Sequence, residues 1–250
     1  MQQNCSGTVI TGVGAVSSSE QKRTNSQQQN EVLPGFDLEA RERLSHATAL
    51  IAGVQSYGAV AARYLTEAGV GKIVLVDEDP KALSSAFKNV DGISNSEVVC
   101  KATRMDGHDA DQLFKPCDLI VDGLNNWQEK LLVSDVCMQI GKPLIHAGGA
   151  GFRFQVFTMR PSRSACLRCV FPLAGIDDVP LQPLEQNSIA AVLGMVGAWQ
   201  SVEAIKLLAK VGATQGNELT KIDFLSGEFE TIRGLDPRTD CPDCGRAPRN

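Results

Sequence analysis

The sequence predicts an α/β protein with a doubly wound, mostly parallel sheet that is continued by antiparallel strands and tied to a structural zinc site. Three observations predict this. Short apolar runs alternate with helical patterns from about residue 47 to residue 148. After Gly151 the pattern changes to segments in which polar and apolar residues alternate. Two C-x-x-C pairs, Cys166/Cys169 and Cys241/Cys244, have the spacing of a zinc site.

The first elements form a βαβ unit. A short helix is predicted in DLEARERLSH, followed by a strand over residues 47–53. Apolar residues from Tyr57 to Ala68 then recur at helical spacing, and Gly69 and Gly71 end this helix. The next segment, KIVLVD, holds a continuous apolar run, which is typical of a strand buried on both faces of a parallel sheet. Such a unit has a right-handed crossover.

The alternation continues through the first part of the chain. Helices are predicted in DPKALSSAF, DADQLF and NWQEKLLVSDVCMQIG, and strands in EVVCKATRM, CDLIVDG and KPLIHAG. Five strands with intervening helices favour a Rossmann-like, doubly wound sheet.

The C-terminal part has a different pattern. The segment FRFQVFTMRP alternates like an exposed antiparallel strand, and TKIDFLSGEFETIRG predicts a hairpin about Ser226-Gly227. Between them, NSIAAVLGMVGAWQSVEAIKLLAKVG predicts a long apolar helix closed by Gly212, and PLAGIDDVPLQPLEQ predicts an exposed loop. We expect residues 32–250 to form a single domain, preceded by a disordered tail, residues 1–31, that is rich in Gln, Ser, Asn and Thr.

Composition and charge exclude some classes of function. A net charge of −5, with no Lys/Arg cluster, argues against nucleic acid as the main partner because phosphate contacts need a basic face. The longest uncharged apolar stretch, Ile189 to Trp199, is shorter than the roughly 20 residues that span a bilayer, so no membrane segment is expected. No basic residues precede the apolar patch TVITGVGAV, so a signal peptide is not expected and the predicted location is cytoplasmic.

The two cysteine pairs are the most specific local signal. Each C-x-x-C turn can place two thiolates on one ion, and four thiolates complete a closed tetrahedral shell, which is typical of a structural zinc site. Such a site would tie the end of the chain to the segment around Cys166. The alternative is two metal-free redox pairs.

The turn GVQSYG, residues 53–58, stands where a nucleotide-binding protein has its glycine-rich loop. Gly53 and Gly58 are present, but Gln55 and Ser56 occupy the middle, where side chains would narrow the approach of a phosphate to the helix N-terminus. Ser56 can still cap the helix. The alternative is an ordinary strand-to-helix turn that only packs.

Acidic residues end two of the predicted strands. Asp77 lies about 24 residues after Gly53, where an acid commonly accepts ribose hydroxyls, and Asp122 ends LIVD at the same edge of the sheet. The alternatives are a solvated strand end for Asp77 and a polar cap of the next turn for Asp122. His146 follows a strand toward the same edge, and we expect a buried, hydrogen-bonded histidine there, with ligand contact as the alternative.

Five segments, in order, resemble the landmarks of the ThiF/MoeB/HesA family, relatives of the ubiquitin-activating enzymes: LPGFDLEARERLSHATALIAG, YLTEAGVGKIVLVD, CLRCVFP, GMVGAWQSVEAIKLL and CPDCG. The resemblance covers about residues 31–246. It implies an ATP-binding α/β fold with structural zinc and a dimeric assembly. Members of the family use ATP and Mg²⁺ to adenylylate the C-terminal Gly-Gly carboxylate of a ubiquitin-like sulfur carrier.

The chain departs from the family pattern at the positions that the resemblance implies are catalytic. The polar residue and the arginine that touch the phosphates correspond to Ser85 and Lys88, and the Mg²⁺-binding aspartate corresponds to Asn125. An arginine lent by the partner subunit falls near Gln29, which is neutral, and the family's phosphate-binding lysine has no counterpart. No cysteine lies between Cys169 and Cys241 to form a thioester or persulfide.

These departures favour a degenerate member, which keeps the scaffold and the zinc but binds ATP and Mg²⁺ poorly, since adenylylation depends on positive groups around the triphosphate. It would bind a carrier protein's tail, along FRFQVF and the loop Asp177 to Glu185, or pair with an active subunit as a homodimer or heterodimer. Two alternatives stay open. One is an active adenylyltransferase with a rebuilt site that uses Lys88, Asn125, Asp77 and Asp122; the other is an NAD-dependent oxidoreductase, suggested by LVDEDPKAL.

Overall fold

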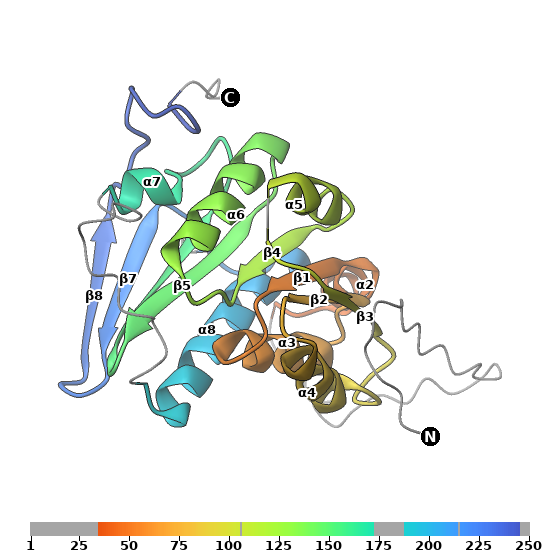
Figure 1. The fold of residues 1–250 in the computed structure, drawn as a ribbon. Coiled ribbons are helices and arrows are strands. Elements are labelled where there is room, and N and C mark those ends of the chain that lie inside the picture. Colours follow the sequence, from red (N-terminus) through yellow and green to blue (C-terminus); the bar gives the residue numbers. More distant parts are fainter. Residues whose placement is uncertain (1–34, 106, 173–187, 215, 246–250) are drawn as a thin grey trace.

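The computed structural model describes residues 35–105, 107–172, 188–214 and 216–245. Its strands are β1 (Thr48–Ala52), β2 (Lys72–Asp77), β3 (Glu97–Ala102), β4 (Leu119–Asp122), β5 (Leu144–Ala150), β6 (Arg153–Met159), β7 (Glu218–Asp223) and β8 (Glu228–Arg233). They form one sheet in the order β3-β2-β1-β4-β5-β6-β7-β8 (Figure 1). The strands β1 to β5 run parallel, and β6, β7 and β8 are antiparallel to their neighbours. The predicted sheet with its antiparallel continuation is confirmed.

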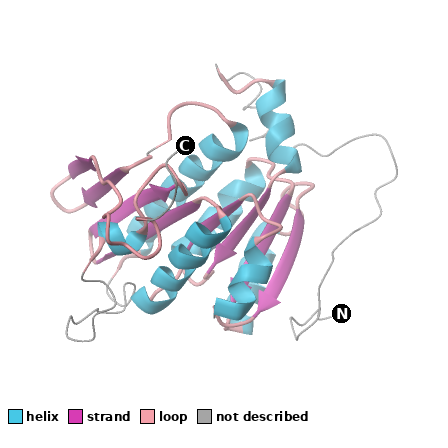
Figure 2. Cartoon of the chain, turned by 90° about the horizontal axis from the view of Figure 1, so that it is seen from above, coloured by secondary structure: helices cyan, strands magenta, loops and turns pink. Residues whose placement is uncertain are grey.

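Helices cover both faces of the sheet. They are α2 (Leu38–His46), α3 (Tyr57–Glu67), α4 (Pro80–Val90), α5 (Gly107–Phe114), α6 (Trp127–Ile140), α7 (Leu167–Val170) and α8 (Ala190–Ala209). Figure 1 and Figure 2 show the sheet between two helical layers. The helices α2, α3, α4 and α8 share one apolar core with Ala49 and Ile51 of β1, whereas α5, α6 and α7 share the other with Leu50 and Ala52. Because side chains alternate along a strand, each parallel strand is buried on both faces, as its apolar sequence predicts.

Side chains at the helix N-termini explain why several helices begin where they do. Asp37, Asp79 and Asn126 each accept a hydrogen bond from a backbone N–H in the first turn of α2, α4 and α6, respectively. Pro80 at the first position of α4 fits the fixed φ of a helix start. The predicted end of the long helix at Gly212 is wrong: α8 ends at Ala209, and Lys210, at φ 57, takes the left-handed cap position first.

The segment FRFQVF is not an exposed strand at the sheet edge, so that prediction is wrong. It forms most of β6, which pairs with β5 on one side and β7 on the other and is mostly buried. The hairpin around Ser226-Gly227 is confirmed, and its second strand, β8, forms the sheet edge. The predicted tail, the position Gln29 and the proline-rich loop from Asp177 to Glu185 lie outside the described residues.

The helix α8 is the only described helix that is long and apolar enough to cross a membrane by length and composition alone. In this fold it packs against α3 and contacts β4, β5 and β6. Val192, Val196 and Ala204 on that side are buried in the core. These contacts explain the apolar residues on that side of α8, whereas 39% of the apolar window as a whole is buried.

Candidate functional site

A pocket of about 210 Å³, here called the crevice, opens at the carboxyl ends of β1, β2 and β4. The strand order changes direction between β1 and β4, and ligands of doubly wound sheets bind at such a switch point. The crevice is lined by the β1–α3 turn, the ends of β2 and β3, and the β4–α6 turn: Gly53, Gln55, Val76, Asp77, Glu78, Thr103, Arg104, Met105, Gly123, Leu124, Asn125, Asn126 and Glu129.

The remaining glycines of the β1–α3 turn are needed for packing against the β4–α6 turn. A Cβ added at Gly53 would lie 2.5 Å from the carbonyl oxygen of Gly123, and one at Gly58 would lie 2.0 Å from that of Gly53. Gly53 also has φ +84, which favours glycine. Backbone packing therefore accounts for the retained glycines without any phosphate, whereas the replaced positions are those of Gln55 and Ser56.

Ser56 occupies the N-cap position of α3 but makes no capping hydrogen bond with its side chain, so the expected cap is wrong. It does not line the crevice. Gln55 does line it, and its side-chain Nε2 donates to Asp77 Oδ1 over 3.1 Å. The middle of the turn therefore presents a glutamine side chain to the crevice.

Asp77 ends β2 beside this turn and is 7% exposed. Its Oδ2 accepts a hydrogen bond from the backbone N–H of Val54 at 2.9 Å, and its Oδ1 accepts one from the N–H of Asp79 at 2.9 Å. Together with Gln55, these donors hold the carboxylate inside the protein. The position agrees with the prediction for a ribose-binding acid; a ligand role for Asp77 stays a prediction.

Asp122 lies behind the crevice, in a fully buried polar network. Its Oδ1 is 3.0 Å from Nζ of Lys130, and its Oδ2 is 2.7 Å from Nδ1 of His146, with all three side chains fully buried. Lys130 Nζ also donates to Tyr57 Oη at 2.9 Å and to the carbonyl of Ala147 at 2.8 Å. The network joins α3, β4, α6 and β5. It gives Asp122 an internal structural role and confirms His146 as a buried, hydrogen-bonded histidine.

The charges of this network are set by the balance of burial and pairing. Burial raises the pKa of Asp122, but Lys130 and the hydrogen bond from His146 lower it more, so the pKa lies below 3.8. Burial lowers the pKa of His146 below 6.5, although the hydrogen bond to Asp122 partly opposes this. Asp122 is therefore an anion paired with Lys130, and His146 is neutral at pH 7. His146 Nε2 is buried and has no hydrogen-bond partner among the described residues.

The other predicted nucleotide-site residues divide into two groups. Ser85 and Lys88 are exposed on α4, and neither lines the crevice. Asn125 lines it, and the side-chain oxygen of Asn125 is buried without a hydrogen-bond partner in the part of the chain that the structure describes. The structure thus brings Gly53, Gln55, Asp77 and Asn125 together around one pocket, and places Ser56, Gly58, Ser85, Lys88 and Asp122 outside its lining.

The charge of the crevice does not suit a polyphosphate. Among the described residues, its lining holds three acidic side chains, Asp77, Glu78 and Glu129, and one basic side chain, Arg104. Arg104 is 73% exposed, and its Nε lies 3.5 Å from Oε1 of Glu129. Sites that stabilise developing phosphate charge concentrate positive groups around it. ATP with Mg²⁺ therefore fits the residues of this crevice poorly.

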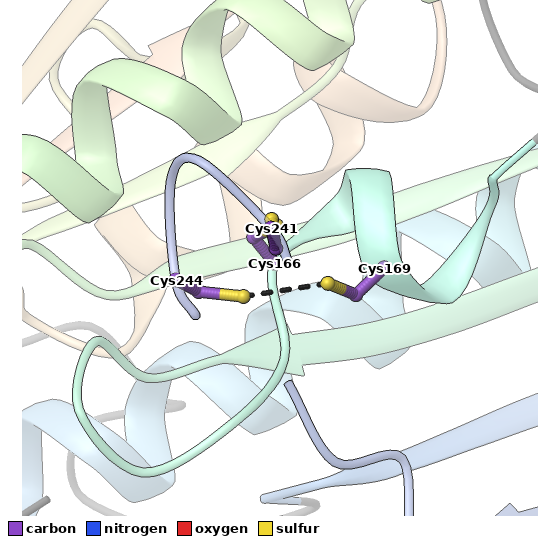
Figure 3. A group of neighbouring side chains, drawn as sticks. All are labelled: Cys166, Cys169, Cys241 and Cys244. Atoms are coloured by element: carbon purple, nitrogen blue, oxygen red, sulfur yellow. Dashed lines mark hydrogen bonds between the residues drawn. The ribbon is translucent and has the colours of Figure 1, made fainter. Parts of the chain in front are cut away.

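The four predicted metal ligands do come together (Figure 3). The Sγ atoms of Cys166, Cys169, Cys241 and Cys244 all lie within 4.8 Å of one another. Cys166 and Cys241 are 3.6 Å apart, and Cys169 and Cys244 are 3.4 Å apart. A tetrahedral ion with Zn–S bonds of ~2.3 Å separates its sulfurs by ~3.8 Å. The cluster fits zinc and would hold it by four thiolates, joining the C-terminal segment to the start of α7.

Local structure shifts the thiols of the cluster in both directions. Burial raises the pKa of Cys166, and it raises that of Cys244 to about 12, so these two ionise readily only when a cation compensates the charge. Burial also acts to raise the pKa of Cys241, but hydrogen bonds, first those of the Cys244 and Asp243 backbone, lower it to about 7. The backbone N–H of Arg238 donates to Cys169 Sγ at 3.4 Å, as is common around metal-bound thiolates. A Cβ at Gly245 would lie 2.4 Å from the carbonyl oxygen of Arg238, which explains the glycine in CPDCG.

With this geometry in place, the family assignment follows from comparison with known proteins. The ThiF family model matches residues 27–86 and 80–243 of the chain. The chain belongs to the ThiF family. The resemblance seen in the order of sequence landmarks is confirmed.

Relatives within the ThiF family and solved structures agree with this assignment. The chain is 30% identical over 237 residues to adenylyltransferase and sulfurtransferase MOCS3 of Bos taurus, covering 87% of this chain and 52% of that protein. It therefore spans about half the length of the curated relatives that it matches. E. coli MccB with ATP superposes with a TM-score of 0.75 at 16% identity, over 89% of this chain and 75% of that one. MccB in complex with N-formylated MccA gives a TM-score of 0.75 at 16% identity, over 84% and 71%. The likeness to MccB shows the shared fold.

Sequence reasoning missed three residues that shape this ThiF-family site. Lys130 and Gln200 are fully buried, and Gln200 Nε2 donates to the carbonyl of Asp122 at 2.8 Å. Arg104, the basic residue of the crevice, was also not anticipated. For Lys130 a signal existed: it lies on the apolar face of its helix, three residues after Trp127 and one before Leu131.

Proposed function

We propose that this chain takes part in the activation of a ubiquitin-like or sulfur-carrier protein with a degenerate ATP site, acting as a carrier-binding or partner subunit. One observation carries the proposal. The crevice keeps the backbone of a nucleotide site, yet the described lining has a single basic side chain, Arg104, against three acidic ones. Without positive groups or an acidic Mg²⁺ ligand at Asn125, the barrier to adenylylation rises by several kcal/mol for each lost group.

The relatives support the general process. MOCS3 is named as an adenylyltransferase and sulfurtransferase, and MccB has been solved with ATP and with the peptide MccA. Partners with an extended tail or a peptide therefore suit this fold. Because this chain spans only about half of its MOCS3 relatives, the sulfurtransferase activity of the whole relative is not part of our proposal.

An exposed apolar patch supports a protein partner. It consists of the exposed Phe152, Leu225 and Phe229, at the turn end of β6–β8, and the half-buried Trp199 on the neighbouring side of α8. The Trp199 and Phe229 rings stack with centroids 6.1 Å apart, and Phe229 is still 59% exposed. Apolar side chains gathered in this way mark protein interaction sites. We propose that the body of the carrier docks here and that its tail runs toward the crevice.

A second apolar surface supports pairing with another subunit. Met195 and Val202 lie two turns apart on the outer face of α8, and each is 54% exposed. We propose this face for a homodimer or for a heterodimer with an active relative. Chromatography with light scattering of the wild type and of Val202→Asp tests it, because a charge on that face should shift the mass to that of a monomer.

The ATP proposal is tested by ATP–pyrophosphate exchange with Mg²⁺ and recombinant β-grasp carriers that end in Gly-Gly. We expect no exchange above background, together with carrier binding that weakens at least tenfold in Phe229→Ser. A matched control is Tyr64→Ser on α3, which changes an aromatic residue that is 44% exposed and lies outside the patch. Exchange at the rate of an ordinary adenylyltransferase would overturn the degenerate-site proposal, and unchanged binding by Phe229→Ser would overturn the docking patch.

An active adenylyltransferase is the second candidate, and the 30% identity to MOCS3 favours it. Here Lys88, Asp77, Asp122 and Asn125 would be assisted by residues of a partner chain. Lys88 is exposed on α4 and Asp122 is fully buried, so this reading requires both to change their surroundings when nucleotide binds. If the wild type catalyses exchange, loss of that exchange in Lys88→Ala and Asn125→Ala would identify these residues as part of an active adenylylation site. Protection from thermal unfolding by NAD but not ATP would instead favour an oxidoreductase.

A further inference from the structure

The carboxylate of Asp77 is already engaged by three donors from the protein. Oδ2 accepts the N–H of Val54 at 2.9 Å, and Oδ1 accepts the N–H of Asp79 at 2.9 Å and Nε2 of Gln55 at 3.1 Å. The first two donors are backbone groups in turns that the packing fixes. The Gln55 amide is the one that can leave by rotation of a side chain. Gln55 is exposed overall, and its hydrogen bond to Asp77 is the one that its side chain makes within the described part of the chain.

An ionised carboxylate offers about four acceptor positions. Three are filled in Asp77, which leaves one. An acid at the end of the second strand of a doubly wound sheet commonly accepts the hydroxyl groups of a ribose. Because a vicinal diol donates two hydrogen bonds, it can bind Asp77 fully only if the amide of Gln55 moves away.

The place that Gln55 occupies belongs to the crevice. Gln55 and Asp77 both line it, as does Gly53, where an added Cβ would lie 2.5 Å from the carbonyl oxygen of Gly123. A glycine at position 55 would leave Oδ1 of Asp77 open to the crevice. The glutamine side chain instead supplies, from within the chain, the N–H donor that a ligand hydroxyl would supply from outside.

We propose that Gln55 is an internal occupant of a diol-binding position on Asp77 and thereby sets the ligand specificity of the crevice. The crevice rejects the ribose of a ligand through this side chain, and its negative charge acts separately against ligand phosphates. The proposal rests on the proposed function, in which the crevice is a nucleotide site in shape but not in use. It predicts that truncating one exposed side chain restores nucleoside binding.

Calorimetric titration of the full, zinc-loaded chain with adenosine and with 2′,3′-dideoxyadenosine tests this. In Gln55→Ala we expect adenosine affinity to rise about tenfold or more over the wild type, since a hydrogen bond to a carboxylate becomes available. Affinity for the dideoxy compound should not change, because it has no diol. Gln139→Ala, an exposed glutamine near the far end of α6, is the matched control and should behave as the wild type.

Two results would overturn the proposal. One is equal adenosine affinity in the wild type and Gln55→Ala; the other is an equal gain for the dideoxy compound, which would mean that the variant only enlarges the pocket. Gln55→Ser, which is too short to reach Asp77 from the same backbone, gives a second variant if the first unfolds. Thermal unfolding without ligand confirms that each variant is folded.

This experiment separates failure of the inference from failure of the proposed function. ATP–pyrophosphate exchange by the wild type would overturn the degenerate site, whatever Gln55→Ala does with adenosine. Absence of exchange together with no gain in Gln55→Ala would leave the degenerate site standing and remove Gln55 as its cause. Adenosine carries no phosphate, so the acidic lining of the crevice does not repel it. A rise in adenosine affinity from a new hydrogen bond to Asp77 would therefore be measurable.

Discussion

The cysteine cluster and the crevice are both built from turns that follow strands, yet their side chains are arranged differently. All four Sγ atoms lie within 4.8 Å of one another, whereas the described lining of the crevice holds one exposed arginine and an aspartate that accepts a hydrogen bond from Gln55. A metal ion bound by four cysteines stabilises the folded chain whenever it is bound. Phosphate-binding side chains contribute only when ligand is bound. On our proposal, the fold depends on the metal ligands, whereas the phosphate-binding residues can change without loss of the fold.

The largest expected effect comes from breaking the cluster. Cys169→Ser should lower metal content and reduce the free energy of unfolding by about 5 kcal/mol or more, because structural zinc binding stabilises the fold directly. For a domain of this size that shift lowers Tm by roughly 10 °C or more. Metal analysis measures the metal content, and calorimetry measures Tm and the stability.

Cys100→Ala is the control for the cluster, since Cys100 is a buried thiol in β3 outside it. It should keep its metal and lose little stability. Equal Tm values for Cys169→Ser and the wild type, with and without a chelator, would show that the cluster does not stabilise the fold by binding metal.

The buried network behind the crevice should show the next largest effect. Lys130→Met removes the partner of a fully buried Asp122 and should reduce the free energy of unfolding by about 3–5 kcal/mol, because an unpaired charge stays in the core. The double variant Lys130→Met with Asp122→Asn should regain part of the lost free energy of unfolding. Denaturant titration compares these variants.

The control for Lys130 is Lys115→Met, which removes an exposed i,i+4 pair with Asp111 and should change stability by at most about 0.5 kcal/mol. If Lys130→Met is as mild as this control, the structure behind the crevice does not depend on the ion pair.

The pH dependence of stability should report His146. Its folded pKa lies below 6.5, so the unfolded chain binds the proton first. The contribution of His146 to the free energy of unfolding is complete above pH ~6.5. It is lost as the pH falls toward the pKa of His146 in the folded protein, by about 1.4 kcal/mol for each pH unit. The contribution of Asp122, whose pKa is lowered below 3.8, is complete above pH ~3.8 and is lost only in more acidic solution.

Unfolding between pH 7 and pH 5 measures this dependence. His146→Gln should flatten the profile, whereas His46→Gln, which changes an exposed histidine, should not. A profile with the same slope in His146→Gln as in the wild type would show that His146 is not the group that titrates.

The same contrast explains what the sequence could predict. Periodicity predicts the helices and parallel strands because each is a local pattern, and C-x-x-C spacing predicts the cluster because each pair closes its own turn. The position of FRFQVF could not be predicted in this way. Its pairing with β7 joins Arg153 to Asp223, and no local pattern shows that a distant hairpin will cover the strand.

Side-chain partners in the crevice were equally hidden. A strand-end aspartate predicts a ligand site, but the pattern does not tell whether a lysine on the next helix will neutralise it, as Lys130 does for Asp122. It also does not tell whether a turn residue will reach back, as Gln55 does to Asp77. A cytoplasmic location likewise stays a prediction from the sequence.

The smallest expected effect lies in the crevice lining. Arg104→Ala removes its one basic side chain, which is 73% exposed and pairs with Glu129 across 3.5 Å, so stability should change by at most about 0.5 kcal/mol. Lys101→Ala on the neighbouring strand is the control. Calorimetry with ATP and Mg²⁺ gives the decisive comparison, because a crevice that no longer serves a triphosphate has little affinity to lose. A tenfold or larger loss of ATP affinity in Arg104→Ala alone would mean that this arginine still holds a phosphate. The crevice would then bind the triphosphate through Arg104, a different residue from those that the family resemblance implies. It would resemble the cluster in having residues that can bind its ligand.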